Sequence, residues 1–301
     1  MRLTFVLWLS GPSILGMLSE VPANAQPCEH WHSANLHAQS VGIIGSVNAV
    51  TVWTPPGGVP LLVAGGSFNT AGGVEANKIA AWDGASWRPL PSTGSGMINS
   101  VYALTVYNGE LIAAGDFTAI SGMPGFNGIA RHDGTRWLPL GAGLDLLPNG
   151  DPYCMALTVF NGELIATGEF WSAGGISARN IARWNGSNWS PLTGGLSMVA
   201  PQDQAAGLCV TVHNGALYAG GWFQVAGATS ASNVARWDGA SWSALGSGIN
   251  GGAWCMTSFG SDLAVGGQFD HAGGQATGAI ARWNGAAWSA YGSTQFYQCA
   301  S

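Results

Sequence analysis

Charged residues are scarce in this chain of 301 residues: Asp, Glu, Lys and Arg together make up 8 %, and Lys78 is the single lysine. An ordinary globular chain is roughly a quarter charged. The formal net charge is −6, and the basic residues form no cluster that could neutralise the phosphates of a nucleic acid. The composition therefore excludes a nucleic-acid partner and predicts a surface of Ser, Thr, Asn, Gly and backbone.

Long hydrophobic runs are also missing after the N-terminus. No later segment approaches the roughly 18 unbroken apolar residues that a membrane-spanning helix needs. Residues 1–25 contain Arg2, an apolar run over 3–18 that is broken at 10–13, and Ala23-Asn24-Ala25. This pattern is typical of a cleavable secretory signal peptide. We expect cleavage after Ala25, a secreted or periplasmic location, and no membrane span.

What the chain has in abundance is repetition. Five copies of one unit align on a Phe, on the end of an I-A-R-W-like strand, and on a second Trp. These positions are Phe68, Phe117, Phe170, Phe223 and Phe269; Trp82, His132, Trp184, Trp237 and Trp283; and Trp87, Trp137, Trp189, Trp242 and Trp288. Successive second tryptophans stand 50, 52, 53 and 46 residues apart. A period near 50 residues is the mark of propeller blades, so the predicted fold is an all-β propeller of four-stranded antiparallel blades.

Turn residues divide each copy into strands a to d. Asn108-Gly109, Asn161-Gly162 and Asn214-Gly215 stand between apolar runs and predict tight hairpins between strands a and b. Asp-Gly or Asn-Gly follows the I-A-R-W-like strand in every copy. We expect a two-residue turn there as well, which would pair Trp82 with Ala85 and Trp87 with Ala80, a large residue against a small one.

The N-terminal segment 26–43 precedes the first full copy. Trp31 lies 18 residues before Ala49, much as Trp87 lies 16 before Ala103, so the segment is expected to contribute an extra strand of the d type. Residues 44–301 are expected to form a single propeller domain. The last copy already has its own strand d, which favours five blades, and an incomplete sixth blade is the alternative.

Five cysteines are present, two of them near the ends of the exported chain. Cys28 and Cys299 are predicted to form a disulfide that latches the ring in an oxidising compartment. Cys154, Cys209 and Cys255 fall on strand a of successive copies and are expected to be small buried residues rather than nucleophiles. Their redox state stays open.

No metal or cofactor site is expected. Glu29, His30 and His32 stand close together in the sequence, but two histidines and one acid are weak evidence for a metal site. A solvated terminal strand explains these residues. The arginine repeated in strand c, as at Arg131 and Arg183, is expected to lie over a Trp of the next blade as a cation–π contact.

The unit resembles Kelch-like propeller repeats. Gly65-Gly66, Gly220-Gly221 and Gly266-Gly267 end strand b as the Kelch diglycine does, with single glycines at Gly115 and Gly168. It looks closest to secreted bacterial repeat proteins ending I-A-R-W-[DN]-G-x-x-W and to the extracellular repeats of fungal cortical polarity markers. The resemblance covers residues 44–292, although the Kelch Tyr-to-Trp spacing is not kept. It implies a binding or scaffold module.

Candidate binding residues are those that interrupt the repeat on the side of the longer loops. They are Asp116, Glu169, Trp171, Trp222 and His271. Acidic and exposed aromatic residues suit a glycan, peptide or protein ligand. No catalytic residue is assigned. A secreted, monomeric, non-enzymatic binding module at the cell surface is the leading hypothesis.

Two alternatives remain. One is a structural envelope repeat without a small ligand. The other is a polysaccharide hydrolase or lyase that uses Asp116 and Glu169 as an acid/base pair, for which the carboxyl groups must lie about 5–10 Å apart.

Overall fold

The described fold is all-β. The computed structural model describes residues 42–90, 97, 99–145, 152–200 and 204–291. Over these ranges the chain forms strands and turns without a helix, and no segment could cross a membrane as a long apolar helix. The expected signal peptide and the Cys28–Cys299 disulfide fall outside the described residues and stay predictions.

Five antiparallel sheets follow one another along the chain, and each holds four strands in the spatial order a, b, c, d. Sheet one is β1 (Ile43–Trp53), β2 (Leu61–Ala71), β4 (Ile79–Trp82) and β5 (Trp87–Arg88), with β3 (Val74–Glu75) added on β2. Sheet two is β6 (Val101–Tyr107), β7 (Glu110–Gly115), β10 (Ile129–His132) and β11 (Trp137–Pro139). Sheet three is β13 (Tyr153–Phe160), β14 (Glu163–Glu169), β17 (Ile181–Trp184) and β18 (Trp189–Pro191).

Sheets four and five repeat this order. Sheet four is β20 (Ala206–His213), β21 (Ala216–Trp222), β24 (Val234–Trp237) and β25 (Trp242–Ala244), and sheet five is β26 (Gly252–Phe259), β27 (Asp262–Gln268), β30 (Ile280–Trp283) and β31 (Trp288–Ala290). Short ladders occupy the connections: β8 (Ala119–Ile120) with β9 (Met123–Pro124); β12 (Leu144–Asp145), β15 (Ser172–Ala173) and β16 (Ile176–Ser177); β19 (Leu196–Ser197), β22 (Val225–Ala226) and β23 (Thr229–Ser230); and β28 (His271–Ala272) with β29 (Gln275–Ala276).

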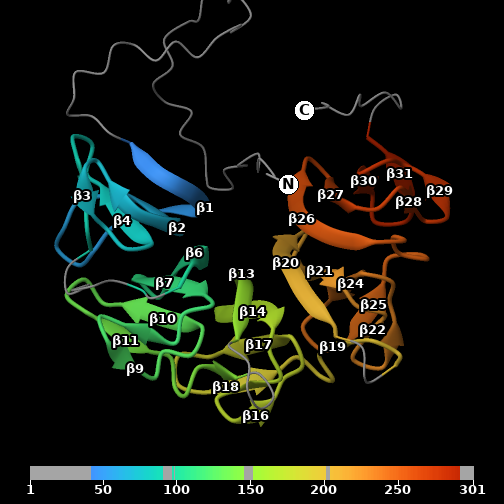
Figure 1. The fold of residues 1–301 in the computed structure, drawn as a ribbon. Helices are drawn as coiled ribbons and strands as arrows, with labels where there is room; N and C mark the ends of the chain where they lie inside the picture. Colours follow the sequence, from blue (N-terminus) through green and yellow to red (C-terminus); the bar gives the residue numbers. More distant parts are fainter. Residues whose placement is uncertain (1–41, 91–96, 98, 146–151, 201–203, 292–301) are drawn as a thin grey trace, which may run out of the picture.

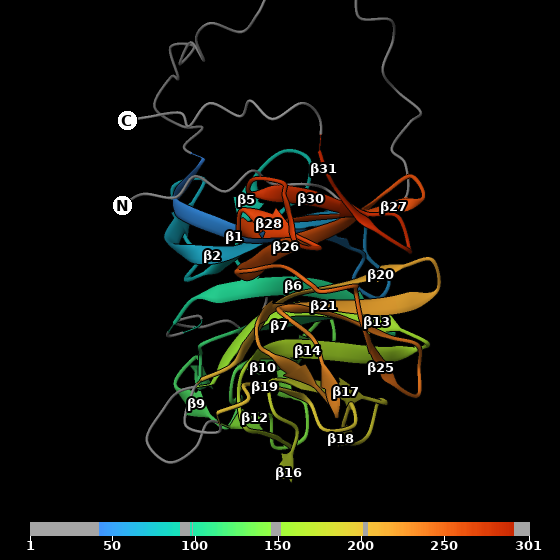
Figure 2. The ribbon, with the colours of Figure 1, turned by 90° about the vertical axis from the view of Figure 1, so that its right-hand side faces the viewer.

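The five sheets are arranged in chain order around a centre, with their first strands innermost (Figure 1). Each first strand packs beside the next, from β1 to β6, β13, β20 and β26. In the orthogonal view the long first and second strands lie along a roughly common axis (Figure 2), and within each sheet they are antiparallel. Equivalent strand ends therefore lie on the same side of the molecule. We call the side where strands a begin and strands b end the loop side.

The Asn-Gly hairpins are confirmed. Asn108 has φ 51° and Gly109 has φ 80°, as a two-residue turn with both central residues at positive φ requires. Tyr107 pairs with Glu110 across this turn. The same geometry recurs at Asn161-Gly162 and Asn214-Gly215.

The predicted register between strands c and d is wrong. Trp82 pairs with Trp87, not with Ala85, because four residues rather than two form the turn. The Asp83 carboxylate accepts hydrogen bonds from the backbone N–H groups of Ala85 and Ser86, at 3.0 and 2.9 Å, and the Ser86 bond, then the Ala85 bond, lower the pKa of Asp83. This side-chain cap stabilises the longer loop.

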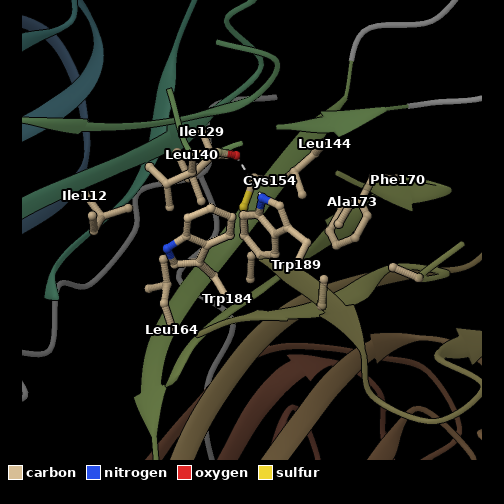
Figure 3. Packing of buried hydrophobic residues seen from close by; sticks show 14 of the residues in the cluster. Ile112, Ile129, Leu140, Leu144, Cys154, Leu164, Phe170, Ala173, Trp184 and Trp189 are labelled. Atoms are coloured by element: carbon tan, nitrogen blue, oxygen red, sulfur yellow. Dashed lines mark hydrogen bonds between the residues drawn. The ribbon is translucent and has the colours of Figure 1, made fainter. Parts of the chain in front are cut away.

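A tilted tryptophan pair follows from that register. The ring centroids of the two tryptophans in sheets one, three, four and five are 5.6, 5.4, 5.2 and 5.3 Å apart. Trp184 and Trp189 of sheet three pack against Leu140 across the interface with sheet two, and Cys154 of sheet three lies in the same cluster (Figure 3). The core is thus a series of layers between neighbouring sheets, each stabilised by aromatic contacts.

The expected cation–π role of the strand-c arginine is also wrong. Arg131 Nη1 lies 2.8 Å from Glu110 Oε1, and Arg183 Nη1 lies 3.1 Å from Glu163 Oε2. Each acid begins strand b of the same sheet and so lies within reach of the arginine on the neighbouring strand. Such half-exposed ion pairs stabilise by at most about 1 kcal/mol. Among the described residues, a cation–π contact is made instead by Arg179.

Candidate binding site on the loop side

Every innermost strand carries a β-bulge near its start. The register of strand a against strand b shifts by one residue in all five sheets, and the extra residues are Asn48, Tyr102, Met155, Leu208 and Trp254. A bulge leaves one residue out of the ladder and redirects its side chain. The repeated bulge therefore places five chemically different side chains at equivalent positions on the loop side.

A glycine faces each bulge from strand b. A Cβ at Gly66, Gly115, Gly168, Gly221 or Gly267 would collide with the backbone carbonyl oxygen just before the bulge, that of Ser46, Ser100, Tyr153, Ala206 or Gly252 respectively. These glycines include the second members of the Kelch-like doublets and the single glycines Gly115 and Gly168. Their repetition therefore has a local steric cause, which is close approach of the two backbones.

Asp116 follows one of these glycines and is fixed by its neighbours. Its Oδ1 accepts a hydrogen bond from the Ser100 backbone N–H at 2.7 Å, and its Oδ2 accepts one from the Tyr102 hydroxyl at 3.0 Å. Asn99 donates to the Asp116 backbone carbonyl oxygen at 3.1 Å. The carboxylate therefore holds the bulge residue Tyr102 in place.

Tyr102 forms an aromatic pair with Tyr153 of the next sheet. Their ring centroids are 6.4 Å apart and their planes differ by 21°. Tyr153 is exposed, and its cross-strand partner in sheet three is Glu169. We call Tyr102 and Tyr153 the tyrosine pair. It joins sheets two and three and lies beside one of the predicted carboxylates, Asp116.

The tyrosine pair was not predicted from the sequence. Tyr102 is the extra residue of a bulge, and Tyr153 lies just before the bulge of the next sheet. The five copies differ at these positions, and the bulge is invisible without the ladder register. The one available signal was an aromatic residue directly before the strand-a positions Ala103 and Cys154.

Asp116→Asn is expected to lower the pKa of Tyr102. Burial, then the Asp116 charge, then the hydrogen bond to Asp116 raise this pKa to about 12, against about 10 in an unfolded chain. The unfolded chain thus loses the proton first, so Tyr102 costs stability as pH rises from about 10 to about 12. Without the Asp116 charge, this loss is smaller.

NMR titration of ring-labelled tyrosine, with Tyr102→Phe to assign the signal, measures the change. Glu169→Gln is the matched control, because no hydrogen bond among the described residues joins its carboxylate to Tyr102. An unchanged Tyr102 titration in Asp116→Asn would show that the hydrogen bond between these residues does not form.

Glu169 and Trp171 lie on either side of Phe170. Glu169 ends β14 half-buried, and none of the hydrogen bonds found in the described residues engages its carboxylate. Trp171 is exposed, its backbone N–H donates to the Asp145 carbonyl oxygen at 2.8 Å, and the Arg179 guanidinium lies 5.1 Å from its ring centroid. One face of this indole is thus already occupied by a cation.

Trp222 and His271 belong to the later sheets. The indole of Trp222 covers Gly252, where a Cβ would collide with the ring. His271 Nδ1 lies 2.6 Å from Asp270 Oδ1, and the Asn250 side-chain oxygen accepts the backbone N–H groups of both residues. The hydrogen bond from His271, then that from Asn250, lower the pKa of Asp270.

The five predicted residues therefore lie in loop-side positions of four sheets, and no hydrogen bond, ion pair or ring contact found among the described residues joins any two of them. The proposed acid/base partnership of Asp116 and Glu169 stays a prediction. The Asp116 carboxylate already accepts two hydrogen bonds.

The described residues contain neither a reactive-thiol site nor a cluster of metal ligands. Cys154 and Cys209 are buried as expected, whereas Cys255 is exposed. Burial raises the pKa of the Cys154 and Cys209 thiols, which keeps them protonated and weakly nucleophilic. No group of three metal-ligating side chains is found among the described residues.

Comparison with solved structures gives distant likenesses. No family model matches the chain, and no curated protein does. Two solved structures of the extracellular domain of BT4673 from B. thetaiotaomicron, described as a hybrid two-component system in one and a one-component system in the other, have TM-scores of 0.41 and 0.38 at 10 % identity. They cover 85 % and 81 % of this chain. This chain spans about a third of their length, 35 % and 33 %. A likeness this distant carries no argument about function.

Proposed function

We propose that this chain is a Kelch-like, five-bladed β-propeller that is exported after cleavage behind Ala25. It acts as a non-enzymatic module that binds a glycan, peptide or protein on its loop side. The five repeated sheets around a centre support the propeller. The apolar N-terminus supports export. The scarcity of charged residues supports a polar, uncharged outer surface.

The observation that carries the binding role is the tyrosine pair with Asp116. Exposed aromatic rings provide a large contact area at low entropic cost, and Tyr153 is exposed at the start of an inner strand. Asp116 holds Tyr102 through its hydroxyl, so the first ring is fixed before a ligand arrives. A fixed aromatic surface with a nearby carboxylate suits a ligand with hydroxyl or amino groups and an apolar face.

Tyr153→Ala is expected to weaken binding about thirtyfold or more, because aromatic hot-spot residues contribute about 2 kcal/mol or more at a binding surface. The measurement is binding of the exported form to a glycan array and to peptide and protein libraries from the same envelope, followed by titration of each hit. Trp222→Ala and Asp116→Ala test the other predicted positions.

Val159→Ala is the matched control, because Val159 is exposed at the opposite end of the same strand, β13. If Tyr153→Ala and Val159→Ala reduce the binding affinity equally, the effect is not specific to the loop side, and the proposed location of the binding site is contradicted. If the folded wild type binds nothing in any library, the binding role is contradicted, and a structural envelope repeat without a small ligand becomes the better hypothesis.

A further inference from the structure

The two end sheets each have an apolar face that no neighbouring sheet covers among the described residues; on sheet five, Phe259 has a ring contact with Tyr291, at the end of the same sheet, with centroids 5.6 Å apart. Sheet five exposes Phe259 and Ile280, at 58 % and 39 %. Their equivalents in sheets one to four are 0–6 % exposed: Trp53, Tyr107, Phe160 and His213 for Phe259, and Ile79, Ile129, Ile181 and Val234 for Ile280. Sheet one exposes Leu62 at 37 %, whereas Leu111, Leu164, Leu217 and Leu263 are fully buried.

These exposures follow from the order of the sheets. Within the series, the face carrying Ile280-like residues packs against the tryptophan pair of the next sheet. Sheet five has no described sheet after it, and sheet one has none before it (Figure 1). The exposed thiol of Cys255 has the same cause, since Cys209 at the equivalent position is covered by sheet five.

A repeated hydrogen bond shows what the exposed face of sheet five lacks. The indole N–H groups of Trp189, Trp242 and Trp288 donate to the backbone carbonyl oxygens of Leu140, Leu192 and Leu245, at 2.9, 3.4 and 2.6 Å. Each acceptor stands three residues after the second Trp of the preceding sheet. Among the described residues, the same bond is not found for Trp137. The next acceptor in the series is the carbonyl of Tyr291, three residues after Trp288.

We propose that residues 26–41 of this chain occupy the space between sheets five and one, with Trp31 as the next tryptophan of the series. Its indole packs on Ile280 and donates to the Tyr291 carbonyl. The segment continues along sheet one, where the half-buried Trp87 lacks the cover that its equivalents have. The series of sheets is thereby latched by its own N-terminal strand.

Spacing and reach support this occupant over a second copy. Trp31 precedes Val47, the residue before the bulge of β1, by 16 residues. The four equivalent intervals, from Trp87 to Val101, Trp137 to Cys154, Trp189 to Gly207 and Trp242 to Ala253, run from 11 to 18. An extended segment of that length reaches about 50 Å, more than the roughly 30 Å diameter of a small domain. The segment precedes β1, the first strand of sheet one.

The test is hydrogen exchange and thermal unfolding of the exported full-length form. Trp31→Ala is expected to lower Tm by at least about 5 °C, from the cost of deleting a buried Trp, and to speed exchange over residues 280–291. Trp31→Phe keeps an apolar ring but no N–H group and recovers part of the shift. His32→Ala, on the opposite face of an extended strand, changes Tm by about 1 °C or less.

A double-mutant cycle identifies the partner. If Trp31 packs on Ile280, Trp31→Ala combined with Ile280→Ala lowers Tm by less than the sum of the two single changes. Additive shifts, or a Trp31→Ala protein indistinguishable from wild type, overturn the proposal. A dimer in light scattering that Ile280→Asp dissociates and Trp31→Ala leaves intact also overturns it, and assigns the face to a second copy.

Discussion

Trp189→Ala is expected to lower the free energy of unfolding by about 3–5 kcal/mol, the range for removing a buried tryptophan. Trp189 is 3 % exposed, packs on Trp184 at 5.4 Å between ring centroids, and donates to the Leu140 carbonyl across the interface with sheet two. Truncation leaves a cavity between two sheets and an unpaired buried carbonyl. Urea unfolding followed by tryptophan fluorescence and circular dichroism measures the loss.

Trp171→Ala is the matched control, because the same substitution is made in the connection that follows β14 of the same sheet, at a residue that is 40 % exposed. Its indole is in contact with the Arg179 guanidinium, so a change of about 1 kcal/mol or less is expected. Similar losses in the two variants would mean that the interface between sheets two and three does not carry the stability assigned to it.

The order of strands was predictable because its signals are local. Asn108-Gly109 can only form a tight turn when both residues adopt positive φ, and the structure shows both values. The fixed period then extends that assignment to each copy. The turn after Trp82 was not predictable in the same way, because Asp-Gly suits both two-residue and four-residue loops. The Asp83 carboxylate, which caps Ala85 and Ser86, decides between them.

The candidate site was predictable only in part. The repeat indicated which positions vary on the loop side, and Asp116 accepts a hydrogen bond from the half-buried Tyr102, whose ring stacks on the exposed Tyr153. The aromatic partner is thus the tyrosine pair rather than Trp171 or Trp222. Its position depends on the bulge and on contact between sheets, and neither feature produces a repeated pattern of residues in the sequence. The exposure of Cys255 likewise depends on its place in the last described sheet.

Gly168→Ala is expected to destabilise the protein by about 3 kcal/mol, the upper part of the range for overpacking. A Cβ at this position collides with the carbonyl oxygen of Tyr153, and both neighbours are backbone of the β13–β14 ladder. Neither strand can move without breaking hydrogen bonds near the bulge. Because Tyr153 belongs to the tyrosine pair, the folded fraction of this variant is also expected to lose binding on the loop side.

The sign of the effect separates this explanation from ordinary glycine entropy. Where a glycine has space and a permissive φ, alanine stabilises a protein by about 0.4–1 kcal/mol, because it restricts the unfolded chain. A Cβ added at Gly42 would meet no atom within 4 Å, and this glycine has no positive φ, so Gly42→Ala is expected to be neutral or slightly stabilising. Chemical unfolding of both variants gives the comparison. If Gly168→Ala also proves neutral, the two backbones lie farther apart than the structure shows, and the glycine near the end of strand b in every copy is not explained by the bulge.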